Sequence, residues 1–171
     1  LTEGAIVERL RHEFQIPLDK HIVHAALIYN DSYRETLAEI YRQYLQIAAD
    51  FRLPLMLMTP TRRANIEQIA ESDYRHKNVL ADNVSFLSRF RTGTSIPVYI
   101  GGLAGCRGDA YDGRYCLSVD EAMEFHFPAV RTMAESGVDY LFAGIMPQLT
   151  EAIGMANAMA ATGLPYIISF M

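Results

Sequence analysis

The stretch GVDYLFAGIMPQLTEAIGMA, residues 137–156, decides the fold of this chain. It begins with an apolar run of strand-favouring residues, turns at Pro147 and continues with helical spacing. A buried strand that leads directly into a helix is the repeating unit of parallel α/β proteins. Functional groups in such proteins gather where strands end, yet Gly144, Ile145 and Met146 bring neither a charge nor a nucleophile to that place.

The same strand-like pattern occurs elsewhere along the chain. Each run is rich in Val, Ile, Leu, Tyr or Phe and lacks strict alternation, as is typical of strands buried on both faces of a parallel sheet. The predicted strands are residues 4–8, 53–58, 96–102, 138–144 and 164–170.

Helical segments separate these runs. Residues 33–50 place apolar side chains along one stripe, Ser118 and Glu121 form a capping box, and Gly163 follows a helix of small residues. The predicted helices are residues 33–50, 78–91, 118–134 and 148–162, and the weakly patterned residues 16–30 are expected to form a short helix that shields a barrel.

The alternation predicts parallel strands with right-handed crossovers, arranged either as a doubly wound sheet or as a (β/α)8 TIM-type barrel. The first run lacks the G-x-G-x-x-G fingerprint of a dinucleotide site, which favours the barrel. A barrel needs eight strands. We therefore expect residues 1–171 to form a single domain with about five βα units of an incomplete barrel, the later strands being missing.

Composition excludes several classes of function. The chain is 50% hydrophobic and 20% charged, with a formal net charge of -5. The sequence contains no cluster of basic residues interleaved with aromatic residues, so we expect no nucleic-acid partner. No apolar run is long enough to cross a bilayer. The charged N-terminal stretch is unlike a signal peptide, so we expect a cytoplasmic protein, with self-association as one way to cover open sheet edges.

Several motifs resemble those of the homocysteine S-methyltransferase family, over nearly the whole chain. The most specific is FHFPAVRTMAESGVDYL, residues 125–141, which is similar to the family pattern F-H-x-P…L-A-x-A-G-V-D-L. The other matching stretches are EGAI at 3–6, TPTRRAN at 59–65, GGLAGC at 101–106, a G-x-Y element at 113–115, GIMPQLTEA at 144–152 and LPYIISF at 164–170.

The resemblance implies a zinc-dependent transfer of a methyl group to the thiol of homocysteine, giving methionine. Zinc would remove the proton from a thiol that is mostly protonated at neutral pH. The family's ligands are three cysteines, one after the sixth strand and a pair near the eighth. Cys106 and Cys116 align with other positions, so this chain offers no metal ligand, and the sequence does not identify the methyl donor.

Departures from the family pattern fall at strand ends. Gly144 stands where the family has an acidic residue facing the amino group of homocysteine, and Arg62 stands where an aromatic residue is usual. Without that acidic residue, the amino group loses a charged hydrogen bond, which weakens its binding by about 1.5 to 3 kcal/mol. This distribution indicates a retained scaffold with an altered pocket.

The candidate substrate-binding residues lie at these strand ends, and no catalytic residue can be singled out. Glu3 is expected either to bind an ammonium group or to accept backbone hydrogen bonds, Thr59 and Thr61 to bind a carboxylate or their own loop, and Arg62 to bind an anion or water. Glycines there permit an unusual backbone or close ligand approach. The full set is Glu3, Gly4, Thr59, Thr61, Arg62, Gly101, Gly102, Gly105 and Gly144.

Two functions remain open from the sequence. The first is a homocysteine S-methyltransferase-like enzyme acting on a small-molecule thiol, provided that the complete protein carries the zinc cysteines. The alternative is a repurposed, non-catalytic barrel that binds a small molecule and has lost the zinc site.

Overall fold

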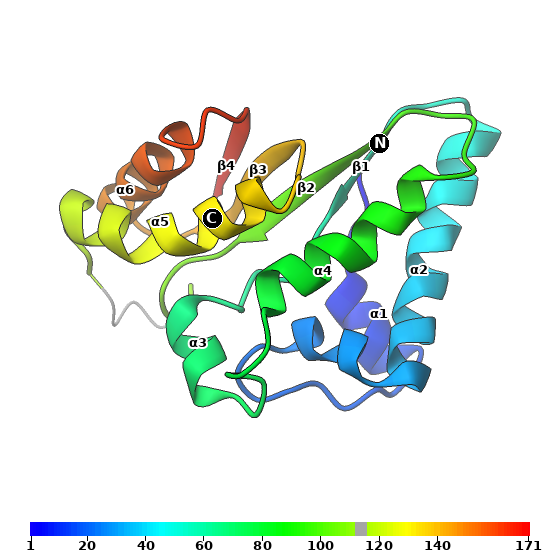
Figure 1. Ribbon diagram of the computed structural model, residues 1–171, viewed down its shortest axis with the longest axis horizontal. Helices are drawn as coiled ribbons and strands as arrows, with labels where there is room; N and C mark the ends of the chain where they lie inside the picture. The colour runs from blue at the N-terminus through cyan, green and yellow to red at the C-terminus, as the bar shows by residue number, and fades with distance from the viewer. Residues whose placement is uncertain (112–115) are drawn as a thin grey trace.

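A computed structural model describes residues 1–111 and 116–171, so the predicted G-x-Y element at 113–115 lies outside the described residues. Its centre is a curled parallel sheet, visible in Figure 1. The strands follow one another in space as they do in the sequence, in the order β1-β2-β3-β4. They are β1 (Leu55–Met58), β2 (Val98–Ala104), β3 (Tyr140–Met146) and β4 (Tyr166–Phe170).

Helices connect these strands, and the four predicted helices are confirmed. Two further short helices, α1 and α3, and a 3-10 turn within residues 16–30 complete the described structure. The elements are α1 (Ile6–His12), η1 (His24–Tyr29), α2 (Asp31–Asp50), α3 (Ile66–Glu71), α4 (Val79–Ser88), η2 (Arg89–Arg91), α5 (Val119–Glu135) and α6 (Leu149–Ala160). None of the helices in the described part of the chain is long and apolar enough to cross a membrane.

The predicted strand at residues 4–8 is wrong. The chain runs alongside β1 only at its start, where Thr2 forms a parallel bridge with Met56, and the left-handed backbone of Ala5 (φ 53°) then redirects it into α1. Ile6 and Leu10, four residues apart, bury the same face of that helix. Helical burial of this pair therefore replaces strand pairing, and the sheet has four strands among the described residues instead of the five predicted.

The strand order decides between the two predicted arrangements. A doubly wound sheet reverses its strand order at a switch point, whereas β1 to β4 follow in sequence without reversal. Right-handed crossovers in an unreversed order place the connecting helices on one face. The result is a half-barrel.

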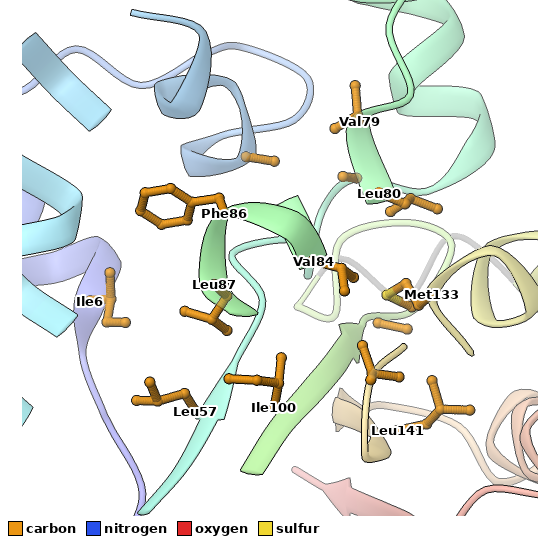
Figure 2. Close-up of a cluster of buried hydrophobic side chains, with 14 of the residues drawn as sticks. Ile6, Leu57, Val79, Leu80, Val84, Phe86, Leu87, Ile100, Met133 and Leu141 are labelled. Carbon is orange, nitrogen blue, oxygen red and sulfur yellow. The ribbon is translucent and has the colours of Figure 1, made fainter. Parts of the chain in front are cut away.

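Side chains from neighbouring strands build the core under the helices. Leu57, Ile100 and Leu141 come from three successive strands and point toward Leu87 of α4 and Met133 of α5 (Figure 2). All five are at most 1% exposed. Burial of a side chain of this size stabilises the fold by about 1.5–3 kcal/mol.

Helices α5 and α6 pack closely because of one glycine. A Cβ atom added at Gly154 would lie 2.4 Å from the carbonyl oxygen of Val119 and 2.5 Å from the Cβ of Ala122. The first turn of α5 is fixed in turn by the predicted capping box, which is confirmed: the Ser118 and Glu121 side chains each bond the other's backbone N–H.

We predict that Gly154→Ala destabilises the protein, although glycine to alanine inside a helix ordinarily stabilises by roughly 0.5–1 kcal/mol. The clash with the Val119 carbonyl forces the helices apart at a cost of about 1–3 kcal/mol, measurable by urea unfolding. Ala160→Gly at an exposed position of the same helix is the control and reports helix propensity alone. A Gly154→Ala variant as stable as the parent would refute the close contact.

Candidate functional site

A cavity of about 410 Å³ lies at the carboxyl ends of the strands. Five of the predicted residues line it: Glu3, Gly4, Thr59, Arg62 and Gly144. A second cavity of about 500 Å³ adjoins it, shares His24, Arg62 and Gly144, and is also lined by Gly105. Thr61, Gly101 and Gly102 do not line either cavity.

Glu3 is a buried carboxyl group whose two oxygen atoms differ in their hydrogen bonding. The end of the N-terminal segment holds it beside β1, where its Oε1 accepts a hydrogen bond of 2.7 Å from the backbone N–H of Met58. Its Oε2 has no partner among the described residues. Burial raises the pKa of Glu3 to about 7, and the Met58 hydrogen bond opposes that shift.

His24, which sequence reasoning missed, faces both cavities. Its side chain is buried and its Nδ1 atom has no partner within the part of the chain described. Burial, together with the charges of Arg62 and Arg11, lowers the pKa of His24 to about 3, so the ring is neutral at physiological pH. No motif marks this histidine, because it reaches the site through the irregular segment before η1.

Thr59 and Thr61 form a closed ring of hydrogen bonds with Leu103. The Leu103 N–H donates to Thr59 Oγ1 (2.9 Å), the two hydroxyls are 2.7 Å apart, and Thr61 Oγ1 donates to the Leu103 carbonyl (2.6 Å). Thr61 uses its one hydroxyl hydrogen on that carbonyl, so Thr59 donates to Thr61. Both hydroxyl hydrogens are occupied in tying β1 to β2.

Two of the predicted glycines make room for packing inside the sheet. A Cβ at Gly101 would lie 2.3 Å from the ring of Tyr140, and one at Gly102 would lie 3.1 Å from Met133 and Leu141. Neither position borders a cavity, so close approach here is to neighbouring side chains.

Gly105 makes room for Arg62, and Gly144 lies beside it. A Cβ at Gly105 would lie 2.6 Å from the Arg62 carbonyl and 3.0 Å from its Cγ, and one at Gly144 would lie 3.9 Å from its Cδ. Gly144 otherwise meets only ordinary contacts, at 3.4 Å or more. The alkyl part of Arg62 thus lies near two glycines that follow different strands.

Three of the five non-glycine residues with positive φ in the described chain border the cavities. Ala5, Val23 and Ile145 all have φ between 52° and 59°, and each lines at least one cavity. A left-handed conformation is a rare outlier for β-branched residues such as Val23 and Ile145. At Ile145 the β3–β4 register shifts, and its N–H donates to Ser169 Oγ at 3.0 Å. Such strain persists where surrounding structure enforces it, commonly at functional sites.

A buried polar network holds the loop after β2. Glu151 of α6 lies 2.9 Å from His126 of α5, and its Oε1 also accepts a 2.7 Å hydrogen bond from the backbone N–H of Arg107. His126 and Glu151 are 2% and 1% exposed. The Arg107 side chain forms an ion pair with Glu67 of α3. The helix pair therefore positions the loop that borders the second cavity.

The described residues do not fit a zinc site. No three His, Cys, Asp or Glu side chains in residues 1–111 and 116–171 gather closely enough to hold a metal ion. Cys106 is buried with its Sγ directed at the Gly108 carbonyl, and burial raises the pKa of its thiol. Cys116 is exposed.

Comparison with known proteins gives a consistent result. A family model described as homocysteine S-methyltransferase matches residues 1–171. The homocysteine S-methyltransferase YbgG of Bacillus subtilis (strain 168) is 44% identical over 45 residues, which cover 26% of this chain and 14% of that protein.

A solved structure shares the fold. The metallated form of the homocysteine methyltransferase MmuM from Escherichia coli superposes with a TM-score of 0.79 at 20% identity, over 100% of this chain. The chain spans 62% of the length of that structure. At this level of identity the likeness establishes a common fold.

We predict that Glu3→Gln removes a pH dependence of stability. Because the folded pKa is raised from 4.5 to about 7, Glu3 favours folding below pH 4.5, and this contribution is lost as pH rises through 7. The free energy of unfolding of Glu3→Gln, relative to the parent, should increase by about 3 kcal/mol across that window. Urea unfolding at pH 4.5 and pH 8 measures it, and a difference that does not change with pH would contradict the raised pKa.

We also predict that Glu151→Ala costs about 3–5 kcal/mol in urea unfolding, since it leaves His126 and the Arg107 N–H without their buried partner. Glu151→Gln keeps an acceptor and should cost less. Glu135→Ala breaks an exposed ion pair with Arg131 on α5 and should cost below about 1 kcal/mol. Equal losses for Glu151→Ala and Glu135→Ala would show that the buried network carries no special weight.

Proposed function

Because this chain belongs to the homocysteine S-methyltransferase family, we propose that its strand-end cavity seats a thiol acceptor of the homocysteine type for S-methylation. The half-barrel then corresponds to the N-terminal part of a (β/α)8 barrel, forming one domain. Family membership supports methyl transfer over the binding-only alternative.

One observation carries the proposal: buried Glu3 lines the cavity, and its Oε2 has no hydrogen-bond partner among the described residues. A buried carboxyl oxygen without a hydrogen bond is costly unless a ligand completes it. The α-ammonium of an amino-acid thiol has three donors and a positive charge, so it meets both needs. We assign Glu3 to that group.

Gly144 fits this assignment. With no side chain at position 144, the end of β3 contributes no charge, and the ammonium contact moves to the end of the N-terminal segment. The space beside Gly144 becomes part of the cavity. Two further residues line the same cavity: Ser169 of β4 contributes a polar side chain, and Phe142 of β3 contributes an apolar one.

The acceptor's sulfur must reach the donor as a thiolate, because the thiolate is the nucleophile in methyl transfer. The described residues hold no metal cluster that would remove the thiol proton, so their role in this proposal is to bind and orient the acceptor. Burial at the strand ends excludes water from the ion pair and strengthens it.

We predict that Glu3→Gln weakens homocysteine binding by about tenfold to a hundredfold, the equivalent of a lost charged hydrogen bond. For the parent protein, affinity should also fall as pH drops below about 7, because Glu3 must lose its proton before it pairs with the ammonium. Isothermal titration calorimetry between pH 5.5 and 8 measures both effects.

The matched control is Glu124→Gln, which removes one carboxylate from the exposed side of α5. It should leave the affinity and its pH dependence as in the parent protein. Homocysteine binding that is insensitive to Glu3→Gln would refute the assignment of the ammonium to this residue.

A further inference from the structure

Arg62 is a cation at the cavity without a partner among the described residues. Its side chain is partly buried and lines both cavities, and no hydrogen bond or ion pair joins it to any of the described residues. Its neighbour Arg63 differs, because it donates to the Gly108 carbonyl (3.2 Å) and lies 3.7 Å from Asp109. Arg62 is therefore held at the site without being neutralised there.

Gly105 makes room for this arginine. The Arg62 stem lies so close to Gly105 that a Cβ atom there would be 3.0 Å from its Cγ, and its Cδ lies near Gly144. Ordering a long arginine side chain costs conformational entropy. The stem of Arg62 is packed against the fold and partly buried, so it loses less of that entropy when a ligand binds, and the planar guanidinium suits a carboxylate.

A second polar group faces the same space. His24 is 6% exposed and lines both cavities, and its Nδ1 has no partner among the residues described. A neutral imidazole can donate one hydrogen bond. The acidic Glu8 also borders the cavities, but it pairs with Arg11 (3.7 Å) and His12 (3.2 Å) on the surface of α1.

We propose that Arg62 and His24 form a subsite for the carboxylate of the acceptor, opposite in charge to the ammonium site at Glu3. This inference rests on the proposed function and adds the second half of the recognition. No ion pair links Glu3 with Arg62 in the described chain, so each charge stays available to the ligand. The two charged residues match the ammonium and the carboxylate that an amino-acid thiol carries on one α-carbon.

Three thiols separate the two halves of the site. Homocysteine carries both charges, 4-mercaptobutyrate carries only the carboxylate, and 3-amino-1-propanethiol carries only the ammonium. Calorimetric titration of the full chain with each thiol, under reducing conditions, gives the affinities for the parent and for the variants Arg62→Met, Arg62→Lys and Arg63→Met.

Arg62→Met should weaken homocysteine and 4-mercaptobutyrate by about tenfold to a hundredfold and change 3-amino-1-propanethiol by less than about twofold. Arg62→Lys should fall between the parent and Arg62→Met, since it keeps the charge and loses the planar fork. Arg63→Met removes the same charge from the adjacent residue, which borders only the second cavity and pairs with Asp109, and should change all three affinities by less than about twofold. Glu3→Gln should show the mirror pattern, sparing 4-mercaptobutyrate.

The results that overturn the proposal are distinct. If Arg62→Met leaves 4-mercaptobutyrate unaffected, or weakens all three thiols equally while circular dichroism shows a folded protein, the carboxylate subsite is refuted and the Glu3 assignment stands. If none of the three thiols binds the parent protein, both the subsite and the proposed function fail. If Arg62→Met does not fold, Arg62→Lys decides, because an unchanged affinity of that variant for 4-mercaptobutyrate refutes the subsite equally.

Discussion

The parallel register of the strands is the constraint on which the site depends. Leu57 pairs with Ile100 and Gly102 pairs with Leu141, so β1, β2 and β3 all point the same way and end at one edge. The register of parallel strands is fixed because a shift by one residue would turn the buried side chains away from the helices. The loops that follow are thereby brought together, although Arg62 precedes Gly105 by 43 residues and Gly144 by 82 residues along the chain.

Buried polar groups are hydrogen-bonded to one another between α5 and α6, whereas two of those at the cavity each keep an atom without a partner among the described residues. Between the helices, His126 and Glu151 satisfy one another and the loop N–H of Arg107. At the cavity, Glu3 Oε2 and His24 Nδ1 remain without partners among the described residues. A network of buried polar groups that are all hydrogen-bonded makes a scaffold rigid. A buried polar atom without a hydrogen bond destabilises the folded chain, and a ligand that binds it can offset that cost. In the proposed scheme, the Glu3 carboxyl group and the Arg62 guanidinium both contact that ligand.

The sequence was enough to predict the α/β class, the four long helices, the capping box at Ser118 and the likeness to a methyltransferase family. These features depend on spacing and caps within a segment, or on motifs that span it. It also indicated Glu3, Arg62 and Gly144, which do meet at one cavity. It failed at residues 4–8, where an apolar run has the composition of a strand but the left-handed turn at Ala5 starts a helix.

Packing between distant segments of the chain determines which of these candidates face the cavity. Thr61 follows β1 and is hydrogen-bonded to Leu103. Gly101 and Gly102 lie inside β2, which continues to Ala104, two residues past the predicted strand, and neighbouring side chains fill the space beside both glycines. His24 carries no local signal, and packing of the irregular segment before η1 brings it to the site. Whether a polar atom has a partner is a property of distant segments placed together, and for that reason only the folded chain reveals it.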